Sequence, residues 1–92
     1  MTAAPPTATD RVRVANDAGH PITLVVAPAA LEHVLAPGAA AVVEAHGPVG
    51  PAAGLLVERT CDTAVVWTWA GARARILADD GRVLADEEGA VG

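Results

Sequence analysis

The chain has 92 residues, which is enough for one small domain and too few for two separate hydrophobic cores. Its formal net charge of −5 repels phosphate backbones, so we expect no nucleic-acid binding. The sequence contains no Ser, Lys, Gln, Phe or Tyr, and this excludes serine nucleophiles, lysine Schiff bases, P-loops and tyrosine acid–base chemistry.

Hydrophobic residues make up 52% of the chain, but 22 of them are alanine, so the expected core is modest and consists mainly of valine and leucine. The lone cysteine, Cys61, excludes an intramolecular disulfide and fits a reducing compartment. Residues 1–9 lack the basic and apolar runs of a secretory signal, and no apolar run approaches 18 residues. We therefore expect a cytoplasmic protein without a membrane partner.

The hydrophobic pattern has a period of two, which is typical of strands, and no window shows a helical period. In residues 11–14, for example, two valines alternate with two arginines. The expected strands are residues 11–14, 22–27, 31–35, 41–45, 55–59, 65–69, 74–77 and 82–84. The third is interpreted as an edge strand.

Turn-forming residues separate these strands. The segment 16–19 has turn composition, Pro37-Gly38 fits a type II turn, and Asp80-Gly81 predicts a hairpin. Residues 46–54, rich in Gly and Pro, predict an irregular loop that joins no ladder. Glu44 should face outward and Val43 inward.

The expected fold class is all-β: a small antiparallel β-sandwich of seven or eight short strands. No crossover helix is visible, so parallel βαβ units have no room. We expect a disordered leader over residues 1–9, one sandwich domain over 10–85 and a flexible acidic tail over 86–92.

The order of strands and turns carries a resemblance. The pattern is V-x-V-x-N at residues 12–16, I-x-L-x-V followed by Pro at 22–28, L-x-P-G at 35–38, and a Val pair at 42–43. It resembles that of small, uncharacterised bacterial β-sandwich proteins. The resemblance implies a fold and, because it consists of turns, no catalytic residues.

The strand texture is also similar to immunoglobulin-like and cupredoxin-like sandwiches. A type 1 copper site requires a His or Met shortly after its Cys, and none follows Cys61. Pairing of Cys61 with a histidine for nucleophilic catalysis lacks a convincing third member. We therefore expect no enzyme activity and no cofactor.

The three histidines, His20, His33 and His46, are each thirteen residues apart. Equal spacing on a meander can bring side chains to one end of a sheet, where three imidazoles could hold zinc. No compact ligand motif such as H-x-H or C-x2-C occurs. We predict no metal site, and the sequence leaves open whether the histidines converge.

Two tryptophans, Trp67 and Trp69, should share a strand face with Val65, either as an exposed stacking platform or as core. Because the chain has no other aromatic residue, the need for core volume favours burial of one or both. The opposite face, which includes Ala64 and Val66, could then contact solvent or a partner.

Four arginines alternate outward on their strands: Arg11, Arg13, Arg73 and Arg75. If the first and seventh strands are neighbours, they form one basic stripe. Such a stripe could bind an acidic partner, or the acidic segment 86–88 of a second copy.

The sequence thus predicts a non-enzymatic protein-interaction or assembly module, with a protein partner or self-association. The alternative is a small-ligand or carbohydrate binding module that uses Trp67, Trp69 and His33.

Overall fold

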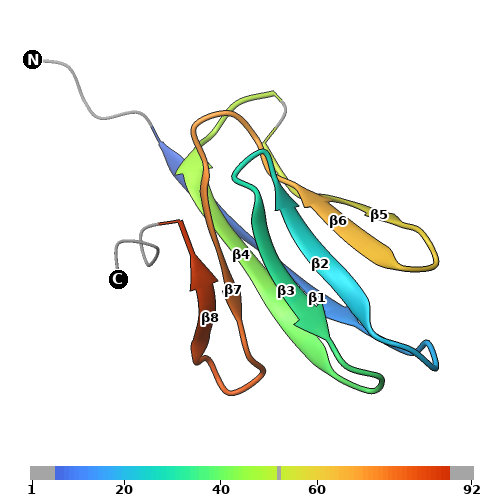
Figure 1. Cartoon of the computed structure of the whole chain (residues 1–92). Helices are drawn as coiled ribbons and strands as arrows, with labels where there is room; N and C mark the ends of the chain where they lie inside the picture. Colours follow the sequence, from blue (N-terminus) through green and yellow to red (C-terminus); the bar gives the residue numbers. More distant parts are fainter. Residues whose placement is uncertain (1–5, 52, 88–92) are drawn as a thin grey trace, which may run out of the picture.

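The computed structural model describes residues 6–51 and 53–87, which form eight strands and no helix (Figure 1). The strands are β1 (Thr7–Ala15), β2 (Ile22–Ala27), β3 (Leu31–Leu35), β4 (Ala40–Pro48), β5 (Leu56–Arg59), β6 (Thr63–Trp67), β7 (Arg73–Leu77) and β8 (Val83–Asp86). The all-β prediction with seven or eight strands is confirmed. This part of the chain contains no helix that is long and apolar enough to cross a membrane.

The strands form two four-stranded sheets. Sheet A has the order β1-β4-β7-β8, and sheet B has the order β3-β2-β6-β5, which confirms β3 as an edge strand. Sheet A is antiparallel throughout, but β2 and β6 in sheet B are parallel, so the expectation of a purely antiparallel fold is wrong for this pair. The chain passes from β3 into sheet A and returns to sheet B at β5, and this route joins the parallel strands without a crossover helix.

Alternate residues of both sheets point inward and form one core. In β2 the inward side chains are Ile22, Leu24 and Val26, each no more than 1% exposed. The core comprises Val14, Ile22, Leu24, Val26, Leu35, Ala41, Val43, Ala45, Ala64, Val66, Trp69, Ala74 and Ile76. Ala64 and Val66 are fully buried, so their side of β6, for which the sequence allowed contact with solvent or a partner, forms part of the core.

Sheet A is longer than its sequence pattern indicates. Residues 7–9, assigned to the leader, pair with residues 46–48, assigned to the irregular loop. The side chains there lack the alternation of large apolar residues that marks a strand. Gly47 explains a close crossing at this end: a Cβ on it would lie 2.6 Å from the Cα of Ala72, so only glycine fits.

The predicted acidic tail also begins inside sheet A. Asp86 belongs to β8 and lies opposite Arg75 of β7, and the Glu87 carboxylate accepts a hydrogen bond from the Ala74 amide. The remainder of the tail, residues 88–92, and the first part of the leader, residues 1–5, lie outside the described residues.

Two predicted turns meet at Asn16. The Pro37-Gly38 turn forms as expected, with Gly38 at φ +82° and a hydrogen bond from the Ala39 amide to the Ala36 carbonyl. The Asn16 backbone exchanges hydrogen bonds with this turn, donating to the Ala39 carbonyl and accepting from the Gly38 amide. Its buried side chain donates to the carbonyls of His20 and Leu35 and accepts from the Ala18 amide, each at 2.9 Å.

Asn16→Ala should lower the free energy of unfolding by about 3 kcal/mol, because it removes three side-chain hydrogen bonds, one of them to the carbonyl of buried Leu35. Urea unfolding monitored by circular dichroism measures the change. The control, Asp17→Ala at the neighbouring exposed position, should change stability by no more than about 0.5 kcal/mol. An Asn16→Ala value as small as that of the control would contradict this account of the turn.

Candidate functional site

The outer face of sheet A carries a row of alternating charges. Strand register places Arg11 of β1 beside Glu44 of β4, Glu44 beside Arg75 of β7, and Arg75 beside Asp86 of β8. Neighbouring strands lie about 4.8 Å apart, so each charged side chain has an opposite charge within reach.

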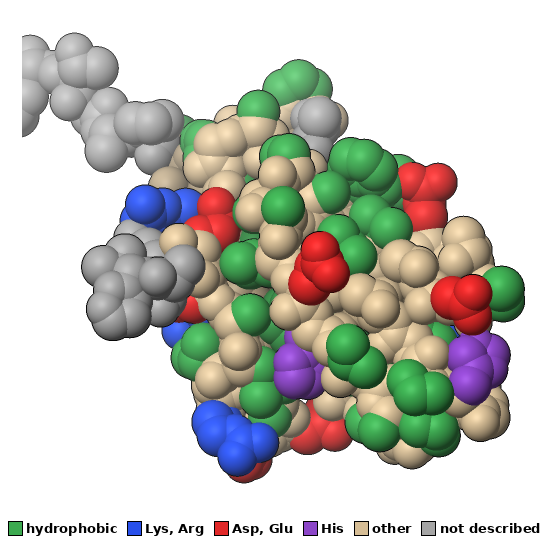
Figure 2. Space-filling model, in the orientation of Figure 1, with side chains coloured by type: hydrophobic (Ala, Val, Ile, Leu, Met, Phe, Trp, Pro, Cys, Tyr) green, Lys and Arg blue, Asp and Glu red, His purple; other side chains and the backbone are tan. Residues whose placement is uncertain are grey.

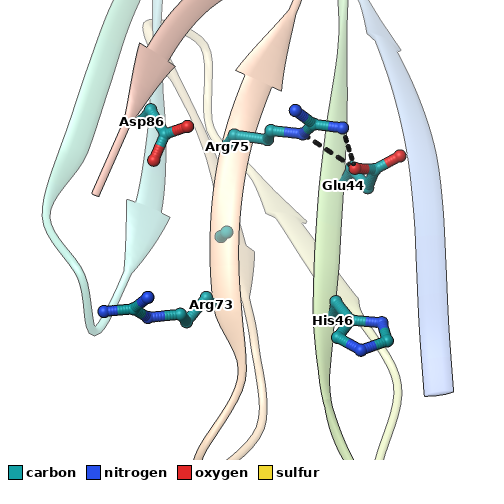
Figure 3. Close-up of a pocket in the computed structure, with 6 residues that line it drawn as sticks. Glu44, His46, Arg73, Arg75 and Asp86 are labelled. Atoms are coloured by element: carbon teal, nitrogen blue, oxygen red, sulfur yellow. Dashed lines mark hydrogen bonds and ion pairs between the residues drawn. The ribbon is translucent and has the colours of Figure 1, made fainter. Parts of the chain in front are cut away.

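Glu44 is the centre of this row. Its carboxylate accepts from Arg11 Nε at 2.6 Å and from Arg75 Nε at 2.8 Å, and the Arg75 contact is drawn in Figure 3. Glu44 faces outward as predicted, yet it is buried, with 10% of its side chain exposed. The hydrogen bond from Arg75 is the main cause that holds the Glu44 pKa below its ordinary value of 4.5, with a further contribution from Arg11, against the effect of burial.

A shallow depression of about 310 Å³ adjoins this row (Figure 3). It is lined by Glu44, His46, Arg73, Ala74, Arg75 and Asp86. Figure 3 shows the Arg73 side chain extending away from His46, so the guanidinium and the imidazole do not converge on one point. The lining offers one imidazole and no hydroxyl or thiol, and this combination does not form a nucleophile–base pair.

The four arginines singled out in the sequence do not form a basic stripe, because β4 lies between β1 and β7. Arg11 and Arg75 both bind Glu44. Arg13 binds Asp79 through Nε at 3.0 Å and Nη2 at 2.9 Å, and its hydrogen bond lowers the Asp79 pKa. Sheet A therefore pairs much of its charge within the chain, and partner binding by Arg11, Arg13, Arg73 and Arg75 stays a prediction.

Glu44→Gln should destabilise the protein by about 1–3 kcal/mol at pH 7, because the two arginines lose their shared charged acceptor. The folded pKa of Glu44 lies below the unfolded value. Its stabilising contribution is therefore complete above pH 4.5 and is lost as the pH falls through the folded pKa. Urea unfolding of both proteins from pH 7 downward should show their difference shrinking below pH 4.5. A difference that stays constant over this range would contradict the assignment.

The histidines lie on three separate elements. His20 precedes β2, and its Nε2 lies 2.8 Å from the Cys61 carbonyl and 3.2 Å from an Asp62 oxygen. His33 is half-buried on β3, and His46 is on the outer face of β4. Within residues 6–51 and 53–87, no three His, Cys, Asp or Glu side chains gather to hold a metal ion.

The two tryptophans face opposite ways, so the expectation that they share a face is wrong. Strand β6 ends at Trp67, which is 43% exposed on the outer face of sheet B. Trp69 lies beyond the strand, where the chain crosses toward sheet A, and it is 7% exposed. Its indole Nε1 donates to the Pro48 carbonyl at 2.8 Å. Burial of one tryptophan is confirmed for Trp69, and His33 faces the interior side of β3 rather than the Trp67 side.

A small hollow lies beside Trp69 at the end of the sandwich. Its volume is about 180 Å³, and its lining includes Pro48, Val49, Pro51 and Ala53. Sites for drug-sized ligands usually measure about 300–1,000 Å³, so this hollow is too small for such a ligand.

The outer face of sheet B is largely apolar. The sequence did not identify it as a surface of interest. Ten side chains of the four strands point outward: Thr23, Val25, Ala27, Glu32, Val34, Leu56, Glu58, Thr63, Val65 and Trp67. Val34 is 62% exposed and Leu56 is 61% exposed. Figure 2 shows hydrophobic side chains on this side of the molecule, interspersed with acidic ones. The alternation Leu56-x-Glu58 was the available signal, but alternation alone does not reveal which face is buried.

Trp67 is held in place on this face by its neighbours on β5. It lies opposite Leu56, and its Nε1 donates to Glu58 Oε1 at 2.6 Å. The indole N–H is therefore satisfied, while much of the apolar ring stays accessible. No family model, curated protein or solved structure matches the chain.

Single-tryptophan variants should separate the two environments. Trp69→Phe leaves only Trp67, whose emission should be red-shifted and readily quenched by iodide, because its ring contacts water. Trp67→Phe leaves only buried Trp69, whose emission should be blue-shifted and protected from iodide. Steady-state fluorescence with quencher titration makes the measurement. Equal quenching of the two variants, with native circular dichroism, would contradict the opposite orientations.

Proposed function

We propose that this protein is a non-enzymatic, cytoplasmic interaction module that binds another protein through the outer face of sheet B. The observation that carries the proposal is the exposure of Leu56 and Trp67, which are neighbours across β5 and β6 on that face. Val34 is exposed on the same face, beside Thr23 at the opposite end of the sheet. Exposed apolar patches of this kind mark interaction sites more often than they serve folding. The core itself is formed by the inward residues of the same strands.

The chemistry of the face suits protein recognition. Trp67 and Leu56 lie side by side across β5 and β6, and Val65 is the next outward residue along β6 from Trp67. Tryptophan is enriched among the residues that dominate protein interfaces, and a surrounding rim of polar side chains excludes water from them. Glu58 and Thr63 supply polar groups beside these residues, and Thr23 and Glu32 supply others farther across the same face.

The dispersal of reactive side chains supports the non-enzymatic part of the proposal. Cys61 is an exposed residue in the β5–β6 turn, and His20 contacts it through its backbone carbonyl. A lone reduced cysteine is also the basis for proposing a cytoplasmic location.

A second candidate function is carbohydrate binding, which the exposed Trp67 ring favours. It has weaker support, because Trp69 is buried and His33 faces the other side of sheet B. Titration with a panel of mono- and disaccharides distinguishes it: saturable quenching of Trp67 emission would support this candidate over protein binding.

Photo-crosslinking in the cells that produce the protein tests the principal proposal. A crosslinking amino acid at position 56 should give a discrete protein adduct, because that side chain lies in the proposed interface. The matched control is position 83, since Val83 is an apolar residue of similar exposure on sheet A. The captured protein is then identified, purified and titrated against the wild type and Leu56→Asp.

Leu56→Asp should weaken binding of the purified partner at least about tenfold, because a charge then replaces the apolar contact beside Trp67. Its stability should fall by no more than about 1 kcal/mol, since the position is exposed on an edge strand. Val83→Asp should bind like the wild type. Equal adducts from positions 56 and 83, or a partner that binds Leu56→Asp normally, would contradict the proposed face.

A further inference from the structure

The outward positions of sheet B carry carboxylates and no basic side chain. Glu32 and Glu58 occupy the two ends of one row across the sheet, with Val25 and Val65 between them. The apolar surface is therefore flanked by negative charge on both edges. On sheet A, by contrast, the central carboxylate is paired with two arginines.

Glu58 is fixed in position beside an exposed aromatic ring. Its Oε1 accepts from the Trp67 indole, and a carboxylate has about four acceptor sites, so further donors can bind it. An arginine is the side chain that can bond a carboxylate through its planar fork and also stack on an indole. The Glu58–Trp67 pair thus provides both a carboxylate that can bind a guanidinium and an indole on which the guanidinium can stack.

A second copy of this chain is a poor occupant for this face. In a face-to-face pair, Glu32 and Glu58 of each copy would approach the same acidic surface of the other, and each copy has a net charge of −5. Like charges brought together across an interface oppose association. Charge complementarity favours a partner that presents cations around apolar side chains.

The contact is also expected on the face of sheet B rather than along the edge of β5. The Asp10 carboxylate of β1 accepts from the Leu55 amide at one end of β5, at 3.2 Å. At the other end, Arg59 Nη1 donates to the Ala15 carbonyl, also at 3.2 Å. These side chains bridge the β1–β5 seam at both ends of β5 and hinder addition of another strand there.

We propose that the outer face of sheet B binds a protein segment whose apolar side chains are flanked by arginine, with one arginine held between the Glu58 carboxylate and the Trp67 indole. The inference rests on the proposed function and adds the chemistry of the partner to it. Leu56, Val65 and Trp67 provide the apolar contact, and Glu32 and Glu58 select the charge.

Three synthetic amphipathic peptides of equal length, without tryptophan, serve as probes. The first has a leucine stripe flanked by arginines, the second has the same stripe flanked by glutamates, and the third keeps the arginines but replaces leucine by alanine. Fluorescence anisotropy with the full chain measures binding at physiological salt. The first peptide should bind and shift Trp67 emission, and the other two should bind at least about tenfold more weakly.

Glu58→Gln tests the arginine site directly. Glutamine keeps an oxygen that can accept from the Trp67 indole but removes the charge, so the fold and the orientation of the ring should persist. Binding of the first peptide should weaken about five- to tenfold, and its dependence on salt should decrease. The matched control is Asp80→Asn, which makes the same change of charge in the β7–β8 turn of sheet A and should bind like the wild type.

The outcomes separate the two proposals. If the leucine peptides bind equally with either flanking charge, and Leu56→Asp abolishes both, the partner chemistry is wrong and the interaction face stands. If the alanine peptide binds as tightly as the leucine peptide, binding is only attraction to the negative net charge, and the inference is overturned. Absence of binding by every peptide also overturns it. The proposed function is then decided by the crosslinking experiment alone.

Discussion

The indole of Trp69 occupies the interior, and its N–H donates to the Pro48 carbonyl at the end of β4. In a chain without Phe or Tyr, this ring is the largest side chain available to the space between two sheets built from Val, Leu, Ile and Ala. Its position requires β6 to end at Trp67 and the following residues to cross to sheet A. Gly47 permits the crossing, because no side chain fits between β4 and Ala72. Trp69 is therefore part of the core, whereas Trp67, the last residue of β6, lies on the outer face of sheet B.

The two outer faces are therefore different kinds of surface. On sheet A, Glu44 is covered by Arg11 and Arg75, and Arg13 is paired with Asp79, so charge is largely compensated within the fold. The exposed Arg13–Asp79 pair contributes little to stability, whereas the buried Glu44 carboxylate needs its two arginines. Both arrangements leave little uncompensated charge on this face for a partner to bind. On sheet B, Leu56 and Trp67 are exposed next to Glu58, and Val34 is exposed next to Glu32 on β3. That asymmetry is the reason to assign recognition to sheet B.

Much of the fold was predictable because its local signals agree. The alternation Ile22-x-Leu24-x-Val26 and the Pro37-Gly38 and Asp80-Gly81 turns each indicate an element that the structure contains. The parallel pairing of β2 with β6 was not predictable, since pairing between distant strands leaves no local pattern. The burial of Glu44 was also not predictable, because the arginines that cover it come from two other strands. Trp67 and Trp69 were misassigned to one face because alternation applies only while the strand continues, and β6 ends between them.

The candidate site was found only in part because it, too, depends on which strands pair and on where each strand ends. The sequence singled out Trp67 but assigned it His33 and Trp69 as companions, whereas its neighbours across the ladder are Leu56 and Glu58. In the sequence, Leu56 and Glu58 are alternating residues of an ordinary strand. They become neighbours of Trp67 only because β5 pairs with β6. An exposed apolar face next to a free sheet edge would also promote aggregation. Asp10 and Arg59 bridge the adjoining seam, and Glu32 and Glu58 place negative charge at the two edges of the face. Repulsion between like charges would oppose face-to-face pairing of two copies, and it is the physical reason that the proposed partner carries the opposite charge.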